Sequence, residues 1–123
     1  MKNILFVGVG VGGFIGAVLR YLIGLLPLGH SDGFPVKTLI INVVGAFAIG
    51  LITALALKRG SNDSALVLML RVGVCGGFTT FSTFAFESVS LMQNGKIWTA
   101  AAYMLLSMIL GCAAIIAAQA IIQ

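Results

Sequence analysis

Four long apolar stretches, separated by short polar segments, account for almost the whole chain. The stretches cover about residues 4–26, 36–57, 66–92 and 97–122. Each is close to or above the roughly 20 residues that a helix needs to cross a bilayer. The connecting segments hold the glycines, prolines and charged residues that are typical of turns. The pattern predicts an all-α membrane protein in which residues 1–123 form a single domain of four transmembrane helices.

The composition supports a multi-pass protein of the cell membrane, with the lipid bilayer as its surroundings. Hydrophobic residues make up 60% of the chain, charged residues only 8%, and the mean hydropathy is +1.16. The first stretch carries Arg20 and is longer than the ~7–15 apolar residues of a signal sequence, so we expect it to be a retained helix.

Several function classes lack their characteristic residues. No basic cluster with interleaved aromatic residues lies outside the apolar stretches, so we expect no nucleic-acid partner. Both cysteines lie inside apolar stretches and the chain has a single histidine, which gives no support to a side-chain metal site. No nucleophile–base pair is recognisable, so we expect no enzyme activity.

The distribution of positive charge leaves the orientation in the membrane open. With four spans, one side of the membrane receives Lys2, Lys58, Arg59 and Arg71. The other side receives Lys37 and Lys96, together with Arg20 if it is counted. Lysine and arginine in excess mark the cytoplasmic side, and here the excess is small. The chain therefore either inserts in both orientations and pairs with an inverted copy, or takes one orientation set by its second loop.

The third stretch contains a polar, glycine-broken segment inside a predicted span. The pair Gly76–Gly77 is followed by four hydroxyl residues within residues 79–83, with phenylalanines between them. Backbone N–H and C=O groups that lack their helical hydrogen bonds are tolerated inside a membrane only where they are buried in protein or line a polar cavity. We therefore expect a broken third helix at an ion or substrate site.

The first stretch carries glycine at every fourth position from Gly8 to Gly16, then Arg20 and Gly24, all on one helix face. Such spacing allows close packing of a second helix, which is the favoured interpretation of the glycines. Arg20 is costly at this depth, by about 2.5–3.5 kcal/mol on insertion scales. It is either an anchor that reaches the interface or a positive group at an anion vestibule.

Polar side chains also occur in the second and fourth stretches. Thr38 and Asn42 lie one turn apart on one face, and Tyr103 and Ser107 form a similar pair. Each side chain either makes an interhelical hydrogen bond, worth about 0.6–2 kcal/mol, or lines a pore.

Phe81 and Phe84 share one side of the third span, with Ser82 and Thr83 on neighbouring faces. The phenylalanines are either core residues or present their positive ring edges to an anion. Glu87 is the one acid within the spans. An interior rich in donors and poor in carboxylates favours a small anion, whereas freed backbone carbonyls suit a hard cation such as Na⁺.

At these residues the chain resembles the Fluc (CrcB) family of fluoride channels. Matching residues in the first two spans are Gly12, Gly13, Gly16, Ala17, Arg20 and Tyr21, then Thr38, Leu39, Asn42 and Gly45. The third span matches through the continuous run of residues 76–84 and through Glu87. The run is long and unusual in composition, and it carries most of the resemblance.

The resemblance implies passive, fluoride-selective conduction that relieves fluoride toxicity. It further implies an antiparallel, dual-topology homodimer with two pores built from both subunits. A structural, non-transported Na⁺ would lie at the dimer centre, held by backbone carbonyls of Gly76 and Thr79 from each subunit. The residues implied at the pores and at their vestibules are Asn42, Phe81, Phe84, Ser82, Thr83, Thr38, Ser107 and Tyr103, with Arg20 and Glu87 at the vestibules.

Two other classes fit the length of the chain. Small proton-coupled multidrug or guanidinium exporters are also four-helix, dual-topology proteins, but they depend on a glutamate in the first helix, where this chain has Arg20. A purely structural membrane subunit would explain the glycines, although not the polar, broken third span.

Overall fold

The computed structural model describes residues 2–29 and 32–123, and these residues form helices and connecting turns only. The helices are α1 (Lys2–Gly24), α2 (Val36–Arg59), α3 (Ala65–Leu68), the π-helix η1 (Met69–Cys75), α4 (Gly76–Phe78), α5 (Phe81–Gln93) and α6 (Ile97–Ile122). Together they give four segments that are long and apolar enough to cross a membrane: α1, α2, residues 65–93 and α6. The prediction of an all-helical chain with four such segments is confirmed.

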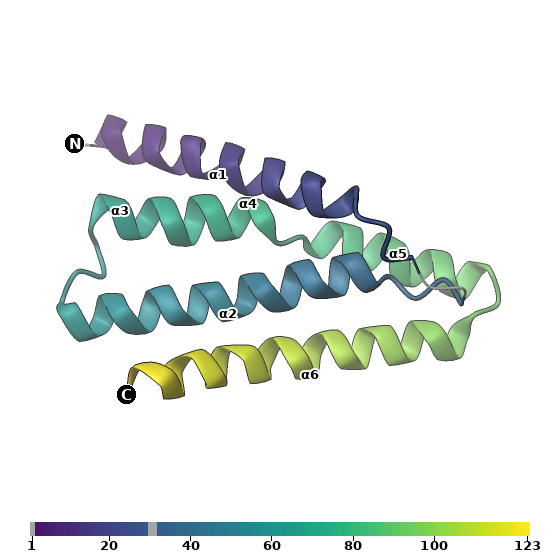
Figure 1. The fold of residues 1–123 in the computed structure, drawn as a ribbon. Coiled ribbons are helices and arrows are strands. Elements are labelled where there is room, and N and C mark those ends of the chain that lie inside the picture. The colour runs from purple at the N-terminus through teal and green to yellow at the C-terminus, as the bar shows by residue number, and fades with distance from the viewer. Residues whose placement is uncertain (1, 30–31) are drawn as a thin grey trace.

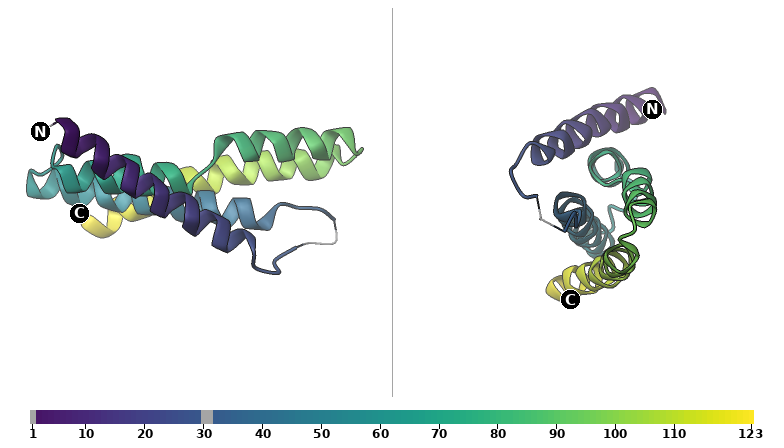
Figure 2. Two further views of the ribbon diagram at one scale, coloured as in Figure 1. Left: turned by 90° about the horizontal axis from the view of Figure 1, so that it is seen from above. Right: turned by 90° about the vertical axis from the view of Figure 1, so that its right-hand side faces the viewer.

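The helices run up and down, so that both ends of the chain lie at the same end of the molecule as the connection between α2 and α3 (Figure 1). The packing divides into two parts. Helix α2 packs along α6, and α1 crosses η1 and α4 (Figure 2). After α5 the chain turns back through Gly95, which has a φ of 78°, so that α5 packs on α6.

The third apolar segment is irregular in its middle. The π-helix η1 leads into α4, after which Thr79 and Thr80 have extended backbone angles, with ψ of 159° and 116°. The extended residues therefore follow the Gly76–Gly77 pair, which we expected to interrupt the helix. Gly76 itself is helical, with φ of −64° and ψ of −37°. Helix α5 restarts because the Thr80 hydroxyl caps it by accepting a hydrogen bond from the Thr83 amide at 3.1 Å.

The glycines of α1 bring its backbone close to the third segment. Gly12 and Gly16 are buried, and a Cβ atom at Gly12 would lie 2.5 Å from the Met69 carbonyl oxygen. From the opposite side, a Cβ atom at Gly77 would lie 2.5 Å from the Gly13 carbonyl oxygen. Gly12 and Gly16 of the series are thus used for packing within one chain, which was the favoured interpretation, whereas a Cβ atom at Gly24 would meet nothing within 4 Å. These two glycines therefore give no separate support to a contact between two chains.

This packing predicts a large difference between two neighbouring glycines. A Cβ atom at Gly16 would collide with the Val74 carbonyl oxygen, a backbone atom that cannot rotate away. We expect Gly16→Ala to lower the free energy of unfolding by about 1–3 kcal/mol. Gly13→Ala is the matched control, because its Cβ atom would meet nothing within 4 Å. Thermal unfolding in detergent measures both; equal stability of the two variants would contradict the close approach of α1.

Candidate functional site

A groove of about 410 Å³ lies beside the helix break, between α2, the third segment and α6. It brings together six of the residues proposed from the sequence: Asn42, Gly76, Thr79, Phe81, Phe84 and Ser107. These residues come from three different membrane-spanning segments and are up to 65 positions apart in the chain (107 − 42). Most of the predicted pore and cation residues are therefore neighbours in space.

Asn42 makes a reciprocal pair of hydrogen bonds with the backbone at the break. Its Nδ2 donates to the Thr80 carbonyl oxygen at 3.1 Å, and its Oδ1 accepts from the Thr80 amide at 2.9 Å. The side-chain amide thus replaces the helical partners that an extended residue has lost. Of the two interpretations left open by the sequence, the interhelical hydrogen bond is present. The second N–H of the Asn42 amide has no partner among the described residues.

The backbone carbonyls at the break differ in their partners. The Gly77 carbonyl accepts from Arg20 Nε at 3.2 Å. The Thr80 amide, which would complete the helical bond to the Gly76 carbonyl, donates to Asn42 instead. Within residues 2–29 and 32–123 no hydrogen bond is made to the Gly76 or Thr79 carbonyl. Two carbonyl oxygens beside one groove fit the ligand preference of a hard cation.

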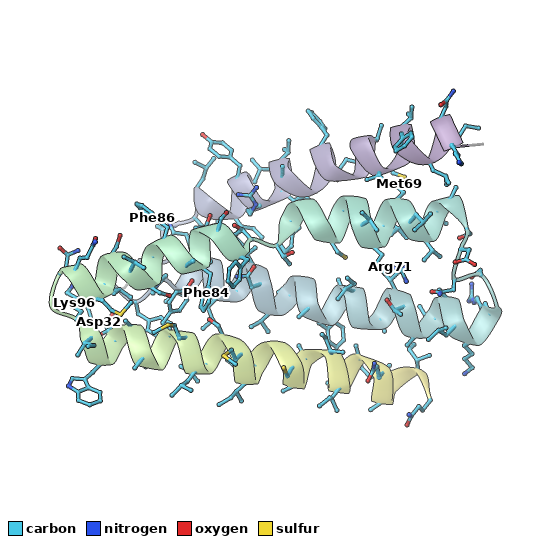
Figure 3. The ribbon with its side chains drawn as sticks, turned by 180° about the vertical axis from the view of Figure 1, so that it is seen from behind. Asp32, Met69, Arg71, Phe84, Phe86 and Lys96 are labelled. Carbon is cyan, nitrogen blue, oxygen red and sulfur yellow. The ribbon has the colours of Figure 1, made fainter. Side chains whose placement is uncertain are left out.

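The two phenylalanines of the groove form part of a row of aromatic rings. Phe81 and Phe84 have ring centroids 6.0 Å apart, and Phe84 lies 5.1 Å from Tyr103. Phe81 is 79% exposed in the single chain, although it lies beside the groove. Phe84 is directed toward α6, whereas Phe86 lies on the other side of α5 (Figure 3). Phe81 is therefore a groove residue that one chain leaves uncovered.

A second cavity, of about 320 Å³, lies between α1, α2 and the start of α5. Its charged side chains are those of Arg20, Lys37 and Glu87. Glu87 accepts from the Thr38 hydroxyl at 2.9 Å and from the Tyr103 hydroxyl at 2.8 Å. Both carboxylate oxygens are thus held by hydroxyl donors from α2 and α6.

The remaining hydroxyl groups differ in their surroundings. The Ser107 hydroxyl oxygen is buried without a hydrogen-bond partner in the described part of the chain, and Ser107 lines the groove. Thr83 lines the second cavity and accepts from the Thr80 hydroxyl at 3.1 Å. Ser82 is exposed, and its oxygen lies 3.4 Å from that of Thr80. The hydroxyl residues predicted at the pores are therefore not gathered in one place: Ser107 lines the groove, Thr83 lines the second cavity, and Ser82 lines neither.

Two residues of this region were not singled out from the sequence. Thr80 lines both spaces, caps α5 and pairs with Asn42. The sequence signal that points to it is a threonine just before a new helical segment, the preferred residue type for an N-cap. Lys37 was counted only as a loop charge, because nothing in the sequence places it beside Arg20.

The model of the family described as CrcB-like protein, Camphor Resistance (CrcB), matches residues 7–119. The chain belongs to the CrcB-like family. Membership together with four spanning helices makes it a multi-pass membrane protein.

Curated relatives of this CrcB-like chain are named as fluoride-specific ion channels. The FluC protein of Ruminiclostridium cellulolyticum is 50% identical over 91 residues, which cover 73% of this chain and 70% of the relative. FluC 1 of Nitrobacter hamburgensis is 41% identical over 125 residues, which cover 100% of this chain and 98% of the relative. The FluC protein of Chlorobaculum tepidum is 45% identical over 103 residues, which cover 84% and 80%. The match thus extends over all four helices.

Proposed function

We propose that this chain is a passive, fluoride-selective channel. The observation that carries the proposal is the groove of Asn42, Phe81, Phe84 and Ser107, in a chain whose curated relatives are named fluoride-specific ion channels. Fluoride is small and strongly hydrated, so a narrow pore must replace its water with donors and positive ring edges. The groove offers an amide N–H, a hydroxyl without a partner and two phenylalanine rings.

The proposed pore requires a second copy of the chain. One chain leaves Phe81 79% exposed and Gly76 exposed beside an open groove. The nearly even division of lysine and arginine between the two ends favours insertion in both orientations. An antiparallel homodimer would close the groove of each copy and give two pores related by symmetry.

The proposed dimer has a structural Na⁺ at its centre. The Gly76 and Thr79 carbonyls lack donors in one chain, and two inverted copies would supply four such oxygens around one point. A bound cation would offset the repulsion between anions in a site of low dielectric constant. In this arrangement Asn42 keeps the Gly76 carbonyl free, because it takes the Thr80 amide that would otherwise close the helix. The Thr79 carbonyl stays free because the Thr83 amide donates to the Thr80 hydroxyl instead.

The alternative is a small proton-coupled exporter. Such a mechanism needs a carboxylate that exchanges protons within the span. Among the described residues the one acid facing the cavities is Glu87, and both of its oxygens accept hydrogen bonds from hydroxyl groups. No observation in the chain favours this alternative over a channel.

Phe81 provides a direct test of the proposed pore lining. We expect Phe81→Ile to lower fluoride flux from loaded liposomes at least about tenfold, because isoleucine has no positive ring edge. Phe86→Ile is the matched control, since Phe86 is similarly exposed, at 74%, but lies outside the groove. Both proteins are compared as intact dimers. Parental flux from Phe81→Ile would show that the ring serves packing only.

A further inference from the structure

The second cavity carries more positive than negative charge. Arg20 and Lys37 contribute two cations and Glu87 one carboxylate, which leaves one net positive charge in about 320 Å³. The two carboxylate oxygens of Glu87 are directed to the hydroxyls of Thr38 and Tyr103. Among the described residues no ion pair joins Glu87 to either cation.

The two cations are bound only to neutral backbone groups. Arg20 donates through Nε to the Gly77 carbonyl, which leaves its two terminal nitrogens without a protein partner in the described residues. Lys37 Nζ donates to the Gly24 carbonyl at 2.9 Å, which leaves two of its three N–H groups. A carbonyl orients a cation but does not neutralise its charge. The cavity therefore retains a positive potential.

The two cations lie at different depths. The Arg20 bond is partly buried and reaches the helix break, whereas the Lys37 bond is exposed at the C-terminal end of α1. Thr80 and Thr83 line the same cavity. An anion that enters beside Lys37 would thus find hydroxyl groups as well as the Arg20 guanidinium in this cavity.

We propose that Lys37 is an anion-capture residue, which with Arg20 draws small hydrated anions from the aqueous phase into this cavity. The proposal rests on the proposed channel function and adds a residue that controls how fast the pore is supplied. A cleft lined by one sign of charge raises the local concentration of its counter-ion and the association rate. Because the effect is electrostatic and exposed, salt weakens it.

The test compares Lys37→Gln with the parent at low and high ionic strength. The Debye length falls from about 30 Å at 0.01 M to about 3 Å at 1 M, so Lys37 attracts distant anions only at low salt. We expect Lys37→Gln to lower fluoride flux about two- to fivefold at low ionic strength and to match the parent at high ionic strength. Lys37→Arg is expected to keep parental flux at both.

Lys96 supplies the matched control. It lies at the same end of the molecule, where its Nζ donates to the Asp32 carbonyl, and it does not line the cavity (Figure 3). Lys96→Gln removes the same charge and is expected to leave flux unchanged at either salt concentration. An equal loss in both lysine variants would assign the effect to overall charge and overturn the proposal.

The remaining outcomes separate this proposal from the channel function. If the parent conducts fluoride and Lys37→Gln conducts equally at low salt, Lys37 has no capture role. A loss of the same size at all salt concentrations would assign Lys37 to holding the end of α1, which also overturns it. If the unsubstituted protein conducts no fluoride, the channel function itself is rejected, and the proposed anion capture by Lys37 is rejected with it.

Discussion

Replacing Asn42 with alanine is expected to remove most of the fluoride flux while leaving a folded protein. Alanine takes away both hydrogen bonds to Thr80 and leaves the backbone amide and carbonyl of Thr80 without partners. An unsatisfied buried polar group costs about 1–3 kcal/mol. Because of this cost, the freed Thr80 amide would bond to the Gly76 carbonyl instead and close the helix. We expect at least about a tenfold loss of flux, which corresponds to 1.4 kcal/mol.

Asn62→Ala is the matched control for this substitution. Asn62 accepts a hydrogen bond from Arg71 at 3.1 Å near the connection between α2 and α3, remote from the groove. The same chemical change there is expected to preserve fluoride flux. Flux is measured from liposomes, and folding by thermal unfolding in detergent. Parental flux from Asn42→Ala would mean that the reciprocal pair is not needed for conduction.

Removing Na⁺ is expected to have the second large effect. If four carbonyls from two copies hold Na⁺, a large organic cation cannot enter between them. Replacing Na⁺ by such a cation therefore leaves the four carbonyl oxygens facing one another without a compensating positive charge. We expect the dimer to dissociate more readily in detergent and fluoride flux to fall with it. Cross-linking and liposome flux measure the two effects. If neither the stability of the dimer nor the fluoride flux changes when Na⁺ is removed, the proposed cation site is refuted.

Substitutions at the break sharpen this test. A Cβ atom at Gly76 would meet only the Arg71 carbonyl, at 4.0 Å, so Gly76→Val is expected to fold as a single chain yet weaken the dimer. Gly111→Ala is the control at another open glycine. Thr79→Ser keeps the hydroxyl that bonds to the Cys75 carbonyl at 2.9 Å and is expected to retain flux. Equal dimer stability in Gly76→Val and Gly111→Ala would contradict close approach at Gly76.

The four spanning segments were predictable because a bilayer imposes both length and composition on them. The position of the irregular backbone in the third segment was less predictable. The glycine pair suggested a break at Gly76–Gly77, but the extended residues are Thr79 and Thr80. Glycine permits a break without requiring one, and here Gly77 is needed for the contact with α1. The site of the break depends on Asn42, which is 38 positions away.

The partners of polar residues were the main feature that periodicity did not reveal. The helical spacing of Thr38 and Tyr103 indicated which side chains share a face, but not that both meet Glu87. Lys37 illustrates the same limit, since it lines the cavity of Arg20 only because the start of α2 lies beside the end of α1, where its Nζ donates to the Gly24 carbonyl. A spacing rule describes one helix at a time, whereas these contacts depend on how helices are packed together.

The most direct test of the account is a comparison of two anions in one preparation. Liposomes that hold the purified protein are loaded with fluoride and chloride, and the release of each ion is recorded with ion-selective electrodes in the absence of a pH gradient. A passive, fluoride-selective channel will release fluoride rapidly while chloride stays inside. Equal release of the two anions, or fluoride release only under a proton gradient, would contradict it.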